Sequence, residues 1–83
     1  MLFYDYVEDI LERRGPHRDA HLNAIRAGKD DGTILLAGPL GDPITGAAIV
    51  FADREAAEAF AQADPYVTGG LVSEWRIELW TLV

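Results

Sequence analysis

The side chains of this sequence that are best suited to proton transfer are two histidines, His17 and His21, which lie four residues apart. Histidine titrates near neutral pH, so it can accept and return a proton. Two imidazoles at this spacing on a helix can also hold a metal ion. Residue 18, however, is an arginine rather than a glutamate, and a cation beside the pair disfavours a metal. We therefore predict no metal site and no cofactor.

Other reactive groups are scarce. The chain has no cysteine, which excludes a thiolate nucleophile and a thiolate metal site. Ser73 and Thr68 carry hydroxyl groups, but no base can be assigned to either from the sequence. The glycines at 38, 41 and 46 lack the spacing of a phosphate-binding loop, and no helix start follows them. The sequence thus indicates neither an activated nucleophile nor a nucleotide site.

Arg18 lies one helical turn before His21 on nearly the same face of the expected helix. A guanidinium matches a carboxylate in shape and charge, so Arg18 is a candidate for binding an anionic substrate. The simpler interpretation is an ion pair with an acidic side chain of this chain, with three candidates: Glu8, Asp9 and Asp64. Tyr66 has two interpretations as well, as a pocket residue or, more simply, as part of an interface.

Hydrophobic periodicity predicts the elements that must position these residues. Strands are expected at residues 2–8, 33–37, 47–52 and 73–83, and helices at 17–31 and 54–63. Gly32 suits the left-handed residue that ends the first helix, and Asp53 is a good N-cap for the second. Gly38 and Pro39 are expected to end the second strand, and Pro65 to stop the second helix. Residues 9–16 and 66–72 read as connections.

The element order is β-α-β-β-α-β, which predicts an α+β fold of the ferredoxin-like kind with an antiparallel sheet. Both helices of such a fold cover one face of the sheet. Apolar residues alternate onto both faces of several strands, so the open face needs a cover, and a second copy of the sheet would supply it. Asp5 is unusual in the middle of a strand; an edge position or a polar cavity would explain it.

Composition limits the classes of function. The chain has 83 residues, 49% of them apolar, and we expect one domain over 1–83 that buries part of its apolar surface in a homodimer. Its net charge of −7 argues against nucleic acid and against anionic membranes as partners. The first residues lack the basic start of a signal peptide, and no stretch has membrane-spanning length, so a cytoplasmic location is expected.

Several short motifs, in this order and spacing, resemble those of the YciI-like (YCII-related) family across roughly residues 2–80. They are Arg18-x-x-His21-Leu22, Gly32, Ala37-Gly38-Pro39, Gly46-Ala47, Ala63-Asp64-Pro65-Tyr66-Val67, Gly69-Gly70 and a final strand that carries tryptophan. Each motif alone is weak, and the set is fairly specific. The chain departs from longer members in its short loop after Pro39, in Asp5 and in Gly70, and the shorter loop puts any lid role of that loop in doubt.

The resemblance implies a ferredoxin-like subunit of a dimeric α+β barrel, with an active site built on His21 and Asp64. It also places Gly38, Pro39 and Tyr66, together with Arg18, among the residues expected to bind a small anionic or aromatic ligand. Most members of the family have no established reaction. A chlorinated-hydroquinone dehydrochlorinase is similar to the family, and muconolactone isomerases share the barrel plan.

A histidine and a carboxylate have a clear chemical use when they are paired. The carboxylate fixes the tautomer of the imidazole and stabilises its charged form, which suits proton abstraction next to a carbonyl, isomerisation or loss of halide. The first hypothesis is therefore a small-molecule enzyme with His21 as general acid or base and Asp64 as its orienting partner. The alternative is a non-catalytic ligand-binding or interaction module, in which His21 satisfies a core hydrogen bond and Asp64 caps a turn. A third hypothesis, a haem-handling barrel, is disfavoured by the polar residues around His21.

Overall fold

A four-stranded antiparallel sheet forms one layer of the molecule. The computed structural model describes residues 1–83. Its strands are β1 (Leu2–Tyr6), β2 (Ile34–Leu40), β3 (Gly46–Phe51) and β4 (Val72–Ile77), in the spatial order β2-β3-β1-β4. The first and third strands in sequence order are therefore central, and β2 and β4 are the edges of the sheet.

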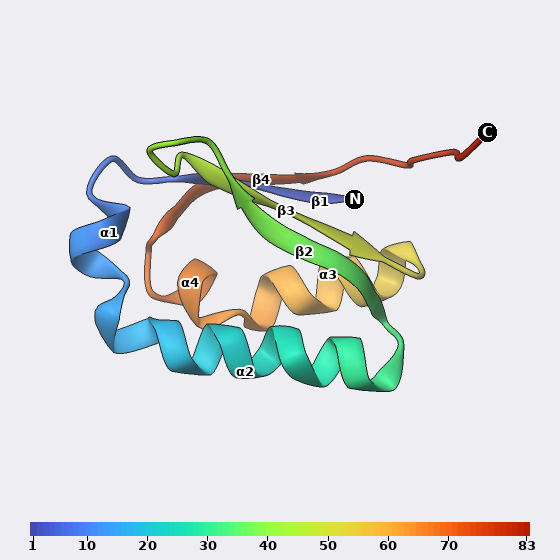
Figure 1. Cartoon of the computed structure of the whole chain (residues 1–83). Coiled ribbons are helices and arrows are strands. Elements are labelled where there is room, and N and C mark those ends of the chain that lie inside the picture. Colours follow the sequence, from blue (N-terminus) through green and yellow to red (C-terminus); the bar gives the residue numbers. More distant parts are fainter.

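The second layer consists of helices that all cover the same face of the sheet (Figure 1). They are α1 (Ile10–Arg13), α2 (Gly15–Asp31), α3 (Arg54–Ala63) and α4 (Pro65–Thr68). The long helices α2 and α3, each linking two strands, complete the βαββαβ order, so the predicted α+β ferredoxin-like fold is confirmed. No helix combines the length and the apolar character that crossing a membrane would require.

The helix ends follow local sequence signals where such signals exist. The bounds of α3 are those predicted, and the Asp53 side chain accepts a hydrogen bond from the Ala56 amide at 2.8 Å. Gly32 ends α2 with φ of 84°, as expected for a left-handed residue. The one-turn helices α1 and α4 lie in segments predicted as connections, because a single turn has too few residues for a periodic pattern.

The predicted strand bounds were wrong by one or two residues for β1 and β3, and by more for β2 and β4. β2 does not stop at Gly38 but continues through Pro39 to Leu40, which is possible because β2 is an edge strand and Pro39 needs no donor on its outer side. β4 ends at Ile77 rather than at residue 83, and the tail beyond it leaves Leu79 91% exposed. A register shift opposite Asp5 and Tyr6 also interrupts the alternation predicted for β4, since Ser73 is the extra residue there.

The core lies between the sheet and the helices. Its main cluster consists of small and medium apolar side chains together with one tyrosine: Leu2, Tyr4, Ile34, Ala47, Ile49, Ala57 and Ala61. Two glycines allow the backbone to approach closely. A Cβ on Gly46 would clash with the Tyr4 carbonyl oxygen, and one on Gly28 would clash with the Ile34 side chain. Gly28, which weakens α2 by propensity, therefore permits the contact of α2 with β2.

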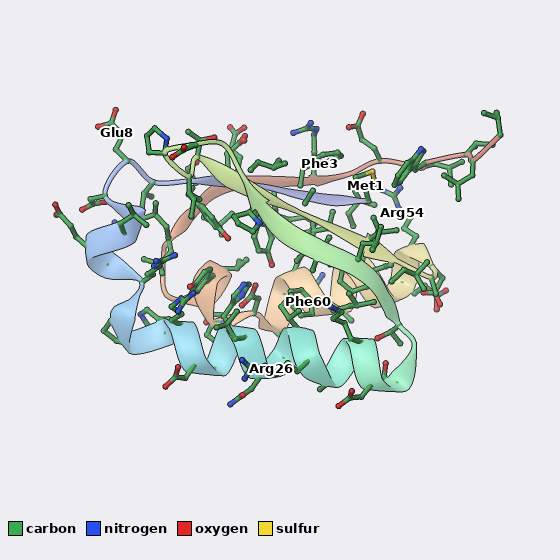
Figure 2. The ribbon with its side chains drawn as sticks, viewed as in Figure 1. Met1, Phe3, Glu8, Arg26, Arg54 and Phe60 are labelled. Carbon is green, nitrogen blue, oxygen red and sulfur yellow. The ribbon has the colours of Figure 1, made fainter.

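The other face of the sheet carries no helix. Pairing partners share a face, so Phe3, Asp5 and Leu36 all point away from the helices, and Figure 2 shows Phe3 on that side. Leu36 is 63% exposed. Asp5 is exposed on the central strand β1, so neither an edge position nor a polar cavity explains it. The expectation of an uncovered, partly apolar face is correct for this chain.

Candidate active site

Asp64 occupies the junction between α3 and α4. It follows the last residue of α3 and precedes Pro65, which cannot continue that helix and instead starts α4. The Asp64 backbone is extended, and its side chain accepts a hydrogen bond from the Tyr66 amide at 3.1 Å, so the residue caps α4. The turn predicted before Pro65 thus points this carboxylate into the protein, where the residue is only 1% exposed.

Three donors surround the Asp64 carboxylate. Besides the Tyr66 amide, the Tyr4 hydroxyl donates to Oδ2 at 2.7 Å, and His21 Nδ1 lies 2.8 Å from Oδ1 and 2.9 Å from Oδ2. The Tyr4 hydroxyl and the Tyr66 amide both donate to this carboxyl group, an arrangement that favours a carboxylate acceptor. His21 completes the arrangement when its Nδ1 carries the proton and donates to the same group.

The imidazole of His21 is held in a single orientation. Its ring stacks on the Tyr66 ring, with centroids 3.8 Å apart and planes 4° from parallel, and Phe60 approaches it edge-on. With Nδ1 protonated, Nε2 carries the free lone pair of the neutral ring. Every side-chain nitrogen or oxygen that solvent cannot reach has a hydrogen-bond partner in this structure. Nε2 has no such partner, so it must be in contact with solvent. His21 is thus 7% exposed and yet accessible at its basic atom.

A cavity of about 310 Å³ adjoins this imidazole, between α2 and the sheet. Nine of the 14 residues that line it are hydrophobic. The lining residues are Tyr6, Ile10, Arg14, Arg18, His21, Leu22, Ile25, Ala37, Gly38, Pro39, Ile44, Ala47, Ile49 and Tyr66. A mostly apolar hollow with a few convergent polar groups is the usual form of a small-molecule site.

The six residues predicted as catalytic or substrate-binding lie at this place, whereas His17 does not line the cavity. His21 and Asp64 are in contact, and Arg18, Gly38, Pro39 and Tyr66 line the same cavity. Arg18 forms no ion pair with an acidic residue, so the pairing predicted as its simpler role is wrong. No three histidine or acidic side chains come together as a possible metal-binding group.

Sequence reasoning missed three residues of the site. Tyr4, the direct partner of Asp64, was predicted only as part of the strand over residues 2–8. Tyr6 lines the cavity from the end of the same strand. Arg14 lies in a segment predicted as a connection, although it stands four residues before Arg18, the spacing that puts two side chains on one face of a helix.

The tyrosines around the site are kept in their neutral form. Burial raises the pKa of the Tyr4 hydroxyl far above its ordinary value, and the nearby Asp64 charge adds to this effect. Burial also raises the pKa of Tyr6, and Tyr66 and Asp64 raise it further. The pKa of Tyr66 is raised by burial as well, while the guanidinium groups of Arg14 and Arg18 oppose that shift. Tyr4 therefore remains a hydrogen-bond donor to the carboxylate over the whole physiological range.

The sequence and fold of the chain match known proteins. The profile of the YCII-related domain family matches residues 1–81. The chain is 39% identical to the protein YciI of Escherichia coli O6:H1 over 85 aligned residues, which cover 86% of this chain and 87% of that protein. YciI of Shigella flexneri matches to the same extent. The resemblance inferred from the motifs is confirmed.

Among solved structures, the fold matches 5-chloro-2-hydroxyhydroquinone dehydrochlorinase from Burkholderia phenoliruptrix AC1100, determined in complex with 2,5-dihydroxybenzoquinone. The TM-score is 0.74, and the match covers 98% of this chain and 94% of that one. The two sequences are 23% identical, so the match establishes a shared fold.

Proposed function

This chain belongs to the YCII-related domain family, and we propose that it is a small-molecule enzyme in which His21 acts as general base and acid. The observation that carries the proposal is the fixed pairing of His21 Nδ1 with the buried Asp64 carboxylate, which leaves Nε2 as a basic atom beside a ligand-sized cavity. In this proposal Asp64 selects the tautomer and stabilises the imidazolium that forms during proton transfer.

The chemistry that fits this arrangement starts with removal of a proton from a carbon next to a carbonyl or a related electron-withdrawing group. Nε2 of His21 takes the proton, and the electron pair of the C–H bond moves into the carbonyl oxygen as an enolate. The imidazolium then returns the proton to another carbon, which completes an isomerisation. Alternatively, the electron pair expels a halide from the neighbouring carbon. No covalent intermediate with the protein is required.

The dehydrochlorinase of similar fold provides further support for the second outcome. Its name describes the loss of hydrogen chloride from a chlorinated hydroquinone, and it was solved with a planar quinone bound. A planar ring of that size is compatible with a cavity of about 310 Å³. We propose that small carbonyl or aromatic compounds form the substrate class, and the fold match does not select one reaction among them.

Deuterium exchange tests the proposal directly. Phenylpyruvate, other 2-oxo acids and chlorinated hydroquinones are incubated with the protein in D₂O. Proton NMR follows the loss of C–H signal, and a chloride-selective electrode follows the release of chloride. We expect exchange or dechlorination above the protein-free rate for at least one compound. We also expect His21→Asn to lower that rate by at least about 100-fold, because general-base catalysis contributes that much.

A matched control is available one turn earlier on the same helix. His17 does not line the cavity, so His17→Asn should leave the rate unchanged. Equal rates for the wild type and His21→Asn would refute the proposed role of His21. If no compound reacts although ligands bind in the cavity, the non-catalytic binding module becomes the better description of this chain.

We also propose that the chain forms a homodimer through the open face of its sheet. The support is the apolar character of that face, where Phe3, Leu36 and Leu40 share a side with Val50 and no helix covers them. Sedimentation velocity should give the mass of two chains, and Leu36→Glu should give the mass of one. A wild type that sediments as a monomer at micromolar concentration would contradict the proposal.

A further inference from the structure

Two of the six arginines differ from the other four in their partners. Arg13, Arg54 and Arg76 each lie within ion-pair distance of an acidic side chain. Arg26 donates to the amide oxygen of Asn23. The remaining two are Arg14 and Arg18, which have no acidic partner, and both line the cavity next to His21. Arg18 hydrogen-bonds Tyr66, a neutral group, and not a carboxylate. In a chain with a net charge of −7, acidic partners are plentiful, so two guanidinium groups without one at the same cavity are unexpected.

The N-terminus of α2 also lacks the residues that usually stabilise the start of a helix. The N-cap is Arg14, whose side chain makes no capping hydrogen bond, and the first turn contains no acidic residue. Arg14 and Arg18 are four residues apart, where like charges repel, and both lie near the positive end of the helix dipole. Each of these unfavourable features would become favourable if an anion were bound between the two side chains.

The cavity changes character along α2. Arg14, Arg18 and His21 follow one another along the helix, and the apolar residues Leu22 and Ile25 come after them. Across the cavity, Ala37 and Ile49 continue the apolar part on the sheet. The hydroxyl-bearing rings of Tyr6 and Tyr66 are close enough to the arginines for the guanidinium charges to act on them. The cavity therefore has a cationic end and an apolar end, with the imidazole between them.

We propose that Arg14 and Arg18 form a subsite that binds the carboxylate of a small ligand whose apolar or aromatic body fills the other end of the cavity. The proposal deepens the proposed function, on which it rests for the part His21 plays, because it names the substrate class as small aromatic or apolar monocarboxylates. The planar fork of a guanidinium matches a carboxylate with two parallel hydrogen bonds.

The position of the subsite relative to His21 restricts the atom that reacts. His21 lies three positions after Arg18, which corresponds to a rise of about 4.5 Å along the helix axis. A carboxylate held by Arg18 therefore brings the carbons nearest to the carboxyl group beside Nε2. These are the C–H groups of a 2-oxo or 3-oxo acid that are acidic enough for an imidazole to deprotonate.

Binding of one acid and its uncharged isostere tests the subsite without any turnover. Phenylacetate and phenylacetamide are titrated separately into ¹⁵N-labelled protein, and amide shifts in α2 report binding. We expect the acid to bind at least about tenfold more tightly, since a charge-assisted hydrogen bond contributes that much. Arg14→Gln and Arg18→Gln should each reduce this preference, and the double variant should abolish it. Both side chains are on the surface of α2, so the variants should fold.

Arg26→Gln provides the matched control, because Arg26 lies on the same helix and points away from the sheet (Figure 2). It should leave the preference for the acid intact. Equal binding of acid and amide by the wild type, or a preference that survives in the double variant, would overturn the subsite. If inorganic phosphate displaces phenylacetate at equal concentration, the assignment to a carboxylate is wrong.

His21→Asn separates this proposal from the proposed function. The variant should keep the preference for phenylacetate over phenylacetamide, because both arginines remain. A preserved preference together with absent deuterium exchange in the wild type would refute only the catalytic role of His21. Measured exchange without any preference for the acid would refute only the arginine subsite.

Discussion

The helices α2 and α3 cover the same face of one sheet, but they differ in their N-terminal residues and in how closely they pack against that sheet. α3 begins with an Asp53 cap and an acidic first turn, five of its ten residues are alanine, and its buried residues Ala57 and Ala61 pack directly against the core. α2 has an arginine at its N-cap, lacks an acid in its first turn and buries only His21 and Gly28 among its 17 residues. A cavity lies between the sheet and the part of α2 that carries Arg18, His21, Leu22 and Ile25.

This difference indicates how the chain divides its residues between stability and function. The N-cap, the acidic first turn and the alanine-rich interior of α3 agree with the local rules for helix formation and close packing. In α2 the same rules are broken at the arginines, which lie beside the candidate site. Departures from local rules are expected at functional positions, because the unfavourable features there are retained for another purpose. The predictions below test this division, from the largest expected effect to the smallest.

Asp64, which ends α3 and holds His21 of α2, joins the two helices. Replacing it with asparagine removes the charge that three donors share and aims an amide N–H₂ at one of them. We expect the free energy of unfolding in urea to fall by about 3 kcal/mol. Asp53→Asn, an exposed cap that accepts a single bond, is the control and should change it by less than about 0.5 kcal/mol. A loss at Asp64 no larger than the loss at Asp53 would contradict the central role of this carboxylate.

The packing of the two helices should respond differently to added volume. Ala61 on α3 is fully buried, so Ala61→Leu should destabilise the protein by about 2 kcal/mol through overpacking. Leu22 on α2 faces the cavity, so Leu22→Phe can grow into free space and should change stability by less than about 1 kcal/mol. Leu22→Phe should instead weaken phenylacetate binding. Thermal unfolding and NMR titration measure the two effects, and an equal loss of stability in both variants would contradict the comparison.

The contrast also explains which parts of the fold could be predicted. α3 was predicted with its correct bounds, because Asp53 and Pro65 are local signals at its two ends. The start of α2 has no such signal, and the prediction placed it at His17 rather than Gly15, so Arg14 was not recognised as its N-cap. The path of β2 through Pro39 depends on β2 being an edge strand, and this follows only from the order of strands in space.

The candidate site was partly predictable for a similar reason. His21 and Asp64 were paired through the resemblance to a family, since 43 residues separate them in the chain. Tyr4 carries no local sign of its bond to Asp64, which lies 60 residues away; the sequence predicted only that Tyr4 lies in a strand. Periodicity thus predicts the face of an element on which a side chain lies. Contacts between residues that are distant in the sequence can be identified only from the three-dimensional structure.

The Tyr4 hydroxyl should make stability depend on pH in alkaline solution. Its pKa is raised in the folded protein, so the folded state keeps a proton that the unfolded chain loses above about pH 10. The stabilisation is complete below that pH, and it decreases by about 1.4 kcal/mol per pH unit as the pH rises further. Urea unfolding between pH 9 and 11 should therefore show a smaller slope for Tyr4→Phe. Identical slopes in the variant and the wild type would exclude Tyr4 as the group responsible.

The smallest effect is expected from exchanging the N-terminal chemistry of the two helices. Asp53→Ala removes the cap of α3 and should cost about 1 kcal/mol. Arg14→Asp places a negative charge at the start of α2 and should gain about 0.5 kcal/mol from the helix dipole. The gain stays small because the Arg14 backbone is helical rather than extended, and the new carboxylate cannot reach a full capping position.

The same substitution, Arg14→Asp, should remove the preference for phenylacetate over phenylacetamide. A protein that becomes more stable while losing its acid preference would show that Arg14 is retained for binding, whereas a loss of stability would mean that Arg14 supports the fold.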